Sequence, residues 1–208
     1  MIKDKKLLKG KTPSRRKFFK AAAATGVAAV AASSLAAPAV AKERIEVSMV
    51  ATWGRDFPGL GTGAQRFAQR ITDVSDGRIQ VTYYAANERV KAFDSFDEVA
   101  SGNSQMYHAA DYYWVKKDPA WGYFTAVPFG FTYTEMNAWI RFAGGQQLWD
   151  ELSDKFGLKN FMCGDTGVQM GGWFNKKIRS PNDFKGLKMR MPGLGGQVIG
   201  KLGGSPVS

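Results

Sequence analysis

Cysteine and histidine are nearly absent from this sequence of 208 residues, which contains only Cys163 and His108. One cysteine cannot form an intramolecular disulfide bond, and the two residues supply too few ligands for an iron–sulfur cluster or a typical zinc site. The fold must therefore be stabilised by its hydrophobic core, and any bound ligand is expected to be small.

A catalytic arrangement is also missing. A serine or cysteine nucleophile needs a base and a third group that orients the base. His108 and Cys163 both lie in segments that we predict to be strands, as a packed core residue and an inert buried thiol. The adjacent acids Asp97 and Glu98 are expected to point in different directions on a helix. We therefore expect a protein that is not an enzyme.

Excess positive charge is concentrated in the first 41 residues. The whole chain carries a net charge of +11, but this segment contributes +8 and leaves +3 for residues 42–208. The remaining balance gives no indication of a nucleic-acid partner.

The same 41 residues have the pattern of a bacterial twin-arginine signal peptide. Basic residues begin the chain, the pair Arg15-Arg16 follows, and an alanine-rich run leads to the small-residue site Ala39-Val40-Ala41. A membrane span needs about 20 predominantly apolar residues, whereas Pro38 and two serines interrupt this run. We predict cleavage near Ala41 and a periplasmic mature protein.

Hydrophobic periodicity predicts alternating strands and helices over residues 45–110. Apolar residues alternate in the strand period after Ile45, and between Leu60 and Val74 they recur at the helical spacings of three and four. The predicted elements are strands at 45–49, 79–83 and 105–110 and helices at 60–74 and 96–100. This order predicts a parallel or mixed sheet with crossover helices.

In such sheets, ligands bind beyond the carboxyl ends of the strands. The loops that begin at Thr52 and Asp111 are predicted to lie there. The second loop opens a segment, residues 111–133, that is rich in aromatic rings. These rings can serve as core packing or as the wall of a pocket.

A second lobe is predicted to begin near residue 134. A helix over 134–157, interrupted at Gly144-Gly145, should be followed by strands at 158–163 and 168–175. The predicted domains are the signal peptide (1–41), a first lobe of βαβαβ order with an aromatic crossover (42–133) and the start of a second lobe (134–208). The last residues enter a strand, which would leave an unpaired edge, so we expect further protein beyond Ser208.

The glycine-rich string from Gly59 to Ala64 has the G-x-G-x-x-A spacing of dinucleotide-binding sites. However, the residues from Ala51 to Pro58 separate it from the preceding strand, and no acidic residue closes the second strand. The glycines are instead expected to begin a helix at a crowded contact. A nicotinamide enzyme would bind its cofactor detectably, and we expect no such binding.

The most informative pattern lies near the end of the sequence. Ser180 to Phe184 reads as a cap and one helical turn, Gly186 turns the chain into a short strand, Leu187 to Met191, and a helix begins at Gly193. Arg190 is thereby placed at a strand end beside a glycine-rich helix start, where a planar guanidinium can bind a carboxylate. The residues alone leave an ordinary surface arginine as the alternative.

This region resembles the substrate-binding proteins of tripartite ATP-independent periplasmic (TRAP) transporters. The resemblance extends from Arg44 to Ser208 and is most specific in Lys188-Met189-Arg190-Met191-Pro192-Gly193 and in Leu202-Gly203-Gly204-Ser205-Pro206-Val207. It implies an α/β fold with two lobes and mixed sheets, with the C-terminal part missing here. It also implies capture of a small organic acid for secondary transport across the inner membrane. The implied partners are the membrane subunits of a TRAP transporter and, in the full-length protein, a second copy in a homodimer.

The resemblance further implies roles for individual residues. Arg190 would form a salt bridge with the substrate carboxylate. Many family members have a second arginine where this chain has Gln169, and the subgroup that binds 2-oxo or 2-hydroxy monocarboxylates resembles this arrangement. Gln169 is therefore the candidate ligand of a sodium or calcium ion that contacts the carboxylate, because an amide oxygen suits a hard cation. Tyr112, Tyr113 and Trp53 correspond to pocket walls, and no other cofactor is required.

The main alternative is a periplasmic enzyme that acts on small organic acids. Such an enzyme would convert its ligand to product, whereas a binding protein would retain it unchanged.

Overall fold

The computed structural model describes residues 44–207, so the predicted signal peptide lies outside the described residues. The helices and strands are β1 (Ile45–Ala51), α2 (Leu60–Val74), β2 (Ile79–Tyr84), α3 (Ser95–Ala100), β3 (Met106–His108), α4 (Tyr133–Phe142), α5 (Gly145–Asp154), β4 (Lys188–Arg190), α6 (Gly193–Lys201) and β5 (Ser205–Val207). Short 3-10 turns are η1 (Ala92–Asp94), η2 (Asp111–Trp114), η3 (Pro119–Phe124) and η4 (Pro181–Phe184).

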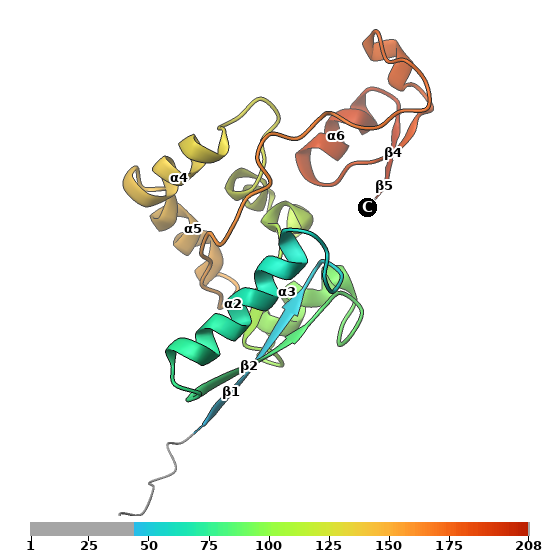
Figure 1. Ribbon diagram of the computed structural model, residues 1–208. Coiled ribbons are helices and arrows are strands. Elements are labelled where there is room, and N and C mark those ends of the chain that lie inside the picture. Colours follow the sequence, from blue (N-terminus) through green and yellow to red (C-terminus); the bar gives the residue numbers. More distant parts are fainter. Residues whose placement is uncertain (1–43, 208) are drawn as a thin grey trace, which may run out of the picture. The chain divides into compact units, whose positions relative to one another are not determined.

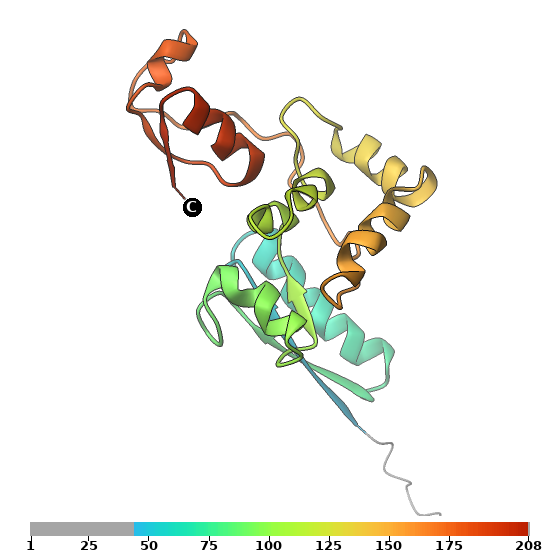
Figure 2. The same ribbon diagram turned by 180° about the vertical axis from the view of Figure 1, so that it is seen from behind.

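The first three strands form a parallel sheet in the order β2-β1-β3. In its register, Ile45 pairs with Ile79 and Met49 pairs with Met106. Figures 1 and 2 show α2 over one face of this sheet and α3 over the other. The strands and crossover helices predicted from hydrophobic periodicity are therefore confirmed.

Helix α2 approaches the sheet through small residues. Ala64 and Ala68 are buried against Met49 of β1. At the start of the helix, a Cβ on Gly61 would lie 2.5 Å from the carbonyl oxygen of Gly54. The expectation that this glycine string begins a helix at a crowded contact is confirmed.

A second, larger hydrophobic cluster is built mainly from aromatic residues. Phe96 of α3 and Trp121 of η3 are almost completely buried, and both rings contact Phe156. The other buried members are Trp114, Met136, Ile140, Trp149, Leu152 and Leu158. Much of the aromatic segment thus forms core. The cluster contains residues from both sides of residue 134, and the division into lobes there remains a prediction.

The interruption predicted at Gly144-Gly145 separates α4 from α5. Thr132 and Glu135 form a capping box at the start of α4, and Gly144, with a φ of 82°, stands between the two helices. This left-handed conformation favours glycine, because a Cβ would clash with the backbone.

The strands predicted at 158–163 and 168–175 are wrong. Between α5 and η4 the structure has neither helix nor strand. This segment pairs with none of the strands among residues 44–207. Alternating apolar residues form a strand only where a partner supplies the hydrogen-bond ladder. Cys163 correspondingly lies outside any strand and is exposed, so its prediction as a buried strand residue is also wrong.

The last elements confirm the predicted order of cap, turn, strand, helix and strand. Ser180 and Asp183 form a capping box at η4, and Gly186 turns the chain with a φ of 70°. Strands β4 and β5 pair in parallel, with Arg190 opposite Val207 and α6 as their crossover. Within residues 44–207, no helix has the length and apolar character needed to cross a membrane.

Candidate functional site

The loop after β1 carries Trp53 at the carboxyl end of the sheet. Arg55 fixes this loop, because its guanidinium donates to both carboxylate oxygens of Glu88 at 2.7 and 2.5 Å and to the carbonyl of Tyr83 at 3.2 Å. The Trp53 ring lies 5.0 Å from the His108 ring, which stands at the end of the neighbouring strand β3. Two adjacent strand ends thus present aromatic rings to the same region.

Directly after β3, η2 adds two tyrosines to this wall. Tyr112 and Tyr113 lie edge to face with centroids 4.7 Å apart, and Tyr113 is 6.5 Å from Trp53. The backbone N–H of Tyr112 donates to the Thr125 hydroxyl at 3.3 Å. The structure therefore brings the three predicted wall residues together.

Arg190 stands at the end of β4 and is exposed. Burial raises the pKa of the Tyr112 phenol above its ordinary value, Tyr113 raises it further, and the positive charge of Arg190 lowers it. Contact between the two segments is close at the start of α6. There a Cβ on Gly193 would lie 3.0 Å from the Cβ of Tyr112. The predicted carboxylate anchor therefore lies beside the predicted tyrosine wall.

Gln169 is not brought into contact with these residues. Its side-chain amide donates to the Thr166 hydroxyl at 2.6 Å, and the residue is exposed. Within residues 44–207, no hydrogen bond or ring contact joins Gln169 to Arg190 or to the aromatic wall. The same segment does pass beside β4, because Gly172 lies directly against the Met189 side chain.

The residues that the structure describes contain no group of three or more His, Cys, Asp or Glu side chains arranged to hold a metal ion. A sodium or calcium ion does not require such a group, because it can be coordinated by amide, carbonyl and water oxygens. The Gln169 side-chain oxygen is one such donor and is accessible to solvent.

One pair that the sequence did not predict is His108 and Cys163, whose Nδ1 and Sγ atoms are 3.2 Å apart. Burial lowers the pKa of His108, and desolvation of the Cys163 thiol raises its pKa although the residue as a whole is exposed, so both groups are favoured in their neutral forms. A nucleophilic cysteine requires the thiolate. This pair is therefore not an activated nucleophile.

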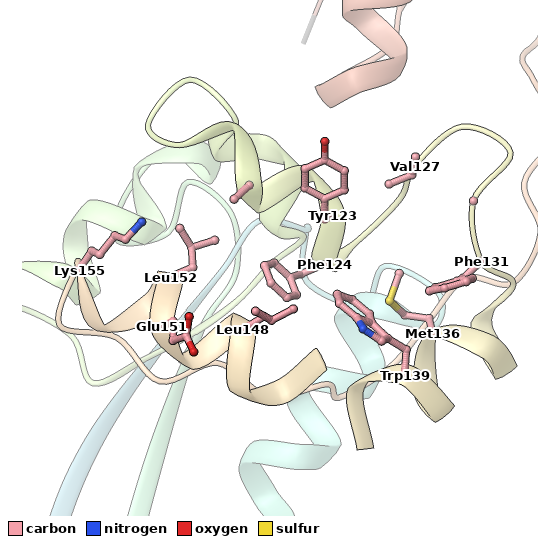
Figure 3. Close-up of a pocket in the computed structure, with 12 residues that line it drawn as sticks. Tyr123, Phe124, Val127, Phe131, Met136, Trp139, Leu148, Glu151, Leu152 and Lys155 are labelled. Carbon is pink, nitrogen blue, oxygen red and sulfur yellow. The ribbon is translucent and has the colours of Figure 1, made fainter. Parts of the chain in front are cut away.

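A separate apolar cavity of about 530 Å³ lies between η3, the loop after it, α4 and α5 (Figure 3). Its lining includes Phe124, Phe131, Trp139 and Leu148, and none of the predicted site residues. Its charged groups are Lys155 and Glu151, whose charges oppose each other. This cavity offers no net positive charge for a carboxylate, unlike the surface at Arg190.

The fold and site define a class of protein. Parallel strands carry an aromatic wall at their carboxyl ends, with one guanidinium beside it and no activated nucleophile among the described residues. This is the chemistry of a protein that binds a small anion. Residues 50–208 match the family "Bacterial extracellular solute-binding protein, family 7", and the chain belongs to that family.

Individual relatives agree with this membership. The chain is 41% identical over 155 residues to a monocarboxylate 2-oxoacid-binding periplasmic protein of Nostoc sp., a match that covers 74% of this chain and 42% of that protein. A TRAP periplasmic solute-binding protein from Pseudoalteromonas atlantica, solved with bound sodium and pyruvate, is 44% identical with a TM-score of 0.77. A second, from Colwellia psychrerythraea with bound calcium and pyruvate, is 41% identical with a TM-score of 0.77.

Both structural matches cover 79% of this chain and 50% of the solved chain. The chain therefore spans about half the length of these relatives. The family resemblance and the fold class inferred from the sequence are confirmed. The family consists of extracellular solute-binding proteins, which agrees with a location outside the cytoplasm, and the comparisons give no support to the enzymatic alternative.

Proposed function

We propose that this protein captures a small 2-oxo or 2-hydroxy monocarboxylate, such as pyruvate, in the periplasm and delivers it to the membrane subunits of a TRAP transporter. The observation that carries this proposal is Arg190 at the end of β4 beside Tyr112. The ligands named for the two similar solved structures support the substrate class.

The proposed binding step is electrostatic. A carboxylate that leaves water must regain its lost hydration, and a bidentate guanidinium replaces two of its hydrogen bonds while supplying the opposite charge. The Tyr112 phenol interacts with Arg190, so both groups would contact the same ligand, and the rings of Tyr113 and Trp53 would cover its apolar side.

A bound cation is the second part of the proposal. Since Gln169 is neutral, it cannot supply charge, but its side-chain oxygen can coordinate sodium or calcium. The two solved relatives were solved with a bound cation, which is sodium in one and calcium in the other. In this protein the ion would bridge Gln169 and the carboxylate, which requires the 165–175 segment to close on Arg190.

The chain organisation predicted from the sequence is part of the same proposal. Residues 1–41 would direct export through the twin-arginine route and be removed near Ala41. Residues 42–133 would belong to one lobe and 134–208 to the other, with the ligand held between them. Dimer formation in the complete protein is a further expectation.

The test is titration calorimetry of the whole protein with pyruvate, for wild type and Arg190→Ala. Removing the guanidinium should weaken binding by about 30-fold or more, because truncating one partner of a charge pair costs about 2–5 kcal/mol. Repeating the titration in sodium buffer, in calcium buffer and after chelation identifies the ion.

Lys188→Ala is the matched control, because it removes one positive charge from the same strand at an exposed position. If both variants weakened binding equally, general attraction rather than a directed guanidinium would explain the result. Unchanged affinity in Arg190→Ala would refute the assignment.

A further inference from the structure

Asp111 is a buried carboxyl group at the junction of three elements. It begins η2 directly before the tyrosine pair and is only 4% exposed. Its Oδ2 accepts a hydrogen bond of 2.7 Å from the indole N–H of Trp149 in α5. The side-chain amide of Asn160, in the segment after α5, lies 3.2 Å from both carboxylate oxygens.

The network extends through Asn160. Its amide nitrogen also donates to the Tyr107 hydroxyl in β3 at 2.8 Å, and its oxygen accepts from the Ser153 hydroxyl in α5 at 3.2 Å. The Asp111 carboxyl therefore connects η2, α5 and the following segment, and reaches β3 through one further residue. Because these groups are buried in a medium of low dielectric constant, their hydrogen bonds are electrostatically stronger than those at the surface.

Within residues 44–207, no basic side chain pairs with this carboxyl group: no Lys, Arg or His forms an ion pair with Asp111. The negative charge of Asp111 raises the pKa of two nearby groups, Tyr107 and Cys163. Burial raises the pKa of Asp111 to about 7, against the opposing effect of the Trp149 and Asn160 hydrogen bonds. A buried acid of this kind is a poor source of stability. Its directed hydrogen bonds point to a role in holding a neighbour in place.

That neighbour is Tyr112. Its main chain follows Asp111 directly, its N–H donates to Thr125, and its Cβ lies against Gly193 at the start of α6. Movement at the first residue of η2 would therefore shift the phenol relative to Arg190. Side chains in a packed contact of this kind have little room to compensate.

We propose that Asp111 is a positioning residue for carboxylate capture, which anchors the start of η2 to Trp149 and Asn160 so that the Tyr112 hydroxyl stays beside Arg190. The inference rests on the proposed function, because it assigns Asp111 a role in that same site. Asp111 itself does not touch the ligand.

A double-mutant cycle on pyruvate affinity tests this role. Asp111→Asn keeps the side-chain shape but replaces one acceptor with a donor, and we expect it to weaken binding by about 10-fold, the effect of about one lost hydrogen bond. Tyr112→Phe should weaken binding by a similar factor. If Asp111 acts through the Tyr112 hydroxyl, the double variant should be little weaker than either single variant.

Leu152→Ala is the control for stability alone. It removes a buried side chain from the same hydrophobic cluster without a hydrogen bond to Asp111. It should lower Tm at least as much as Asp111→Asn while leaving pyruvate affinity unchanged. If Asp111→Asn does not fold, Trp149→Phe replaces it in the cycle, because it removes the indole donor and keeps a ring beside Phe124, on which Trp149 stacks at 5.3 Å.

Three outcomes overturn the inference. Unchanged affinity in the Asp111 or Trp149 variant, or factors that multiply in the double variant, would remove the positioning role and leave the proposed function intact. A wild-type protein that binds no pyruvate or related acid would remove both.

Discussion

At the scale of single residues, Arg190 shows how a binding group differs from a structural one. Its guanidinium is exposed and pairs with no acid among the described residues, whereas Arg55 and Arg89 pair with Glu88 and Glu98. A structural arginine already donates its hydrogen bonds to an acidic side chain of the protein, so it is not available to a ligand. An arginine without an acidic partner among the described residues, held beside a tyrosine at a strand end, remains available to a carboxylate ligand.

Asp111 makes folding stability depend on pH in a direction opposite to that of an ordinary carboxyl group. Burial raises its pKa from about 3.8 to about 7, so the folded protein binds the proton more tightly than the unfolded chain. Its contribution to the free energy of unfolding is present at pH 4 and is lost as pH rises to about 7. Since a neutral amide does not titrate, the stability of wild type relative to Asp111→Asn should fall by a few kcal/mol between pH 4.5 and pH 8.

Denaturant unfolding of both proteins at the two pH values measures this difference. Comparing wild type with the variant removes the contribution of other groups, including His108, whose lowered pKa acts in the opposite direction. A wild-type-minus-variant difference that is independent of pH would show that Asp111 is ionised throughout and that its burial costs less than the geometry indicates.

At the scale of elements, local sequence patterns were sufficient to predict those helices and strands that are determined by the spacing of their own side chains. The alternation after Ile45 and the three–four spacing after Leu60 predicted β1 and α2, and Gly144 marked the end of α4. The segments at 158–163 and 168–175 were wrongly predicted as strands. A strand depends on partner strands, and the identity of those partners is not written in the local sequence.

The candidate site likewise contains residues that the local sequence could indicate and residues that it could not. Arg190 could be singled out because it lies in the motif Lys188 to Gly193 that carries the family resemblance, whereas its place at a strand end left a surface arginine as the alternative. The Asp111 network could not, since Trp149 is 38 residues away and Asn160 is 49 residues away along the chain. Neither residue carries a periodic signal that marks it as a partner.

Gly193 joins two elements that the sequence separates widely, and its replacement should disturb both stability and binding. Its φ of 63° is left-handed, and a Cβ would come within 3.0 Å of the Tyr112 side chain. Gly193→Ala should therefore lower the free energy of unfolding by about 1–2 kcal/mol for the backbone strain alone. It should also weaken pyruvate binding, because the displaced phenol no longer lies beside Arg190.

Gly200→Ala is the matched control in the same helix. A Cβ there would meet only Pro206, at 3.9 Å, and helical residues favour alanine over glycine by up to about 1 kcal/mol, although Gly200 lies in the last turn of α6. This variant should be as stable as wild type or more so, with unchanged affinity in calorimetry. Equal losses in both variants would mean that α6 is sensitive to any added methyl group, and the specific contact with Tyr112 would lose its support.

At the scale of the whole molecule, charge is distributed unevenly along the chain. The first 41 residues carry +8, and the other 167 carry only +3. A concentrated basic segment before an alanine-rich run suits an export signal, whereas the remainder has little net charge to hinder the approach of an anionic ligand. We therefore propose that the basic character of the sequence reflects the route of the protein and not its partner.

The arginine pair in that segment gives a prediction about the export route. Replacing Arg15 and Arg16 with lysine keeps the charge and removes the twin-arginine motif, so the protein should accumulate uncleaved in the cytoplasm of its bacterial host. Fractionation followed by mass spectrometry measures this, and wild-type protein from the periplasm should begin at Lys42. Replacing Lys5 and Lys6 with glutamine lowers the charge by two and leaves the pair intact, so export should continue. Normal periplasmic levels of the double-lysine variant would assign the protein to a general secretory route, because only the twin-arginine pathway distinguishes arginine from lysine at equal charge.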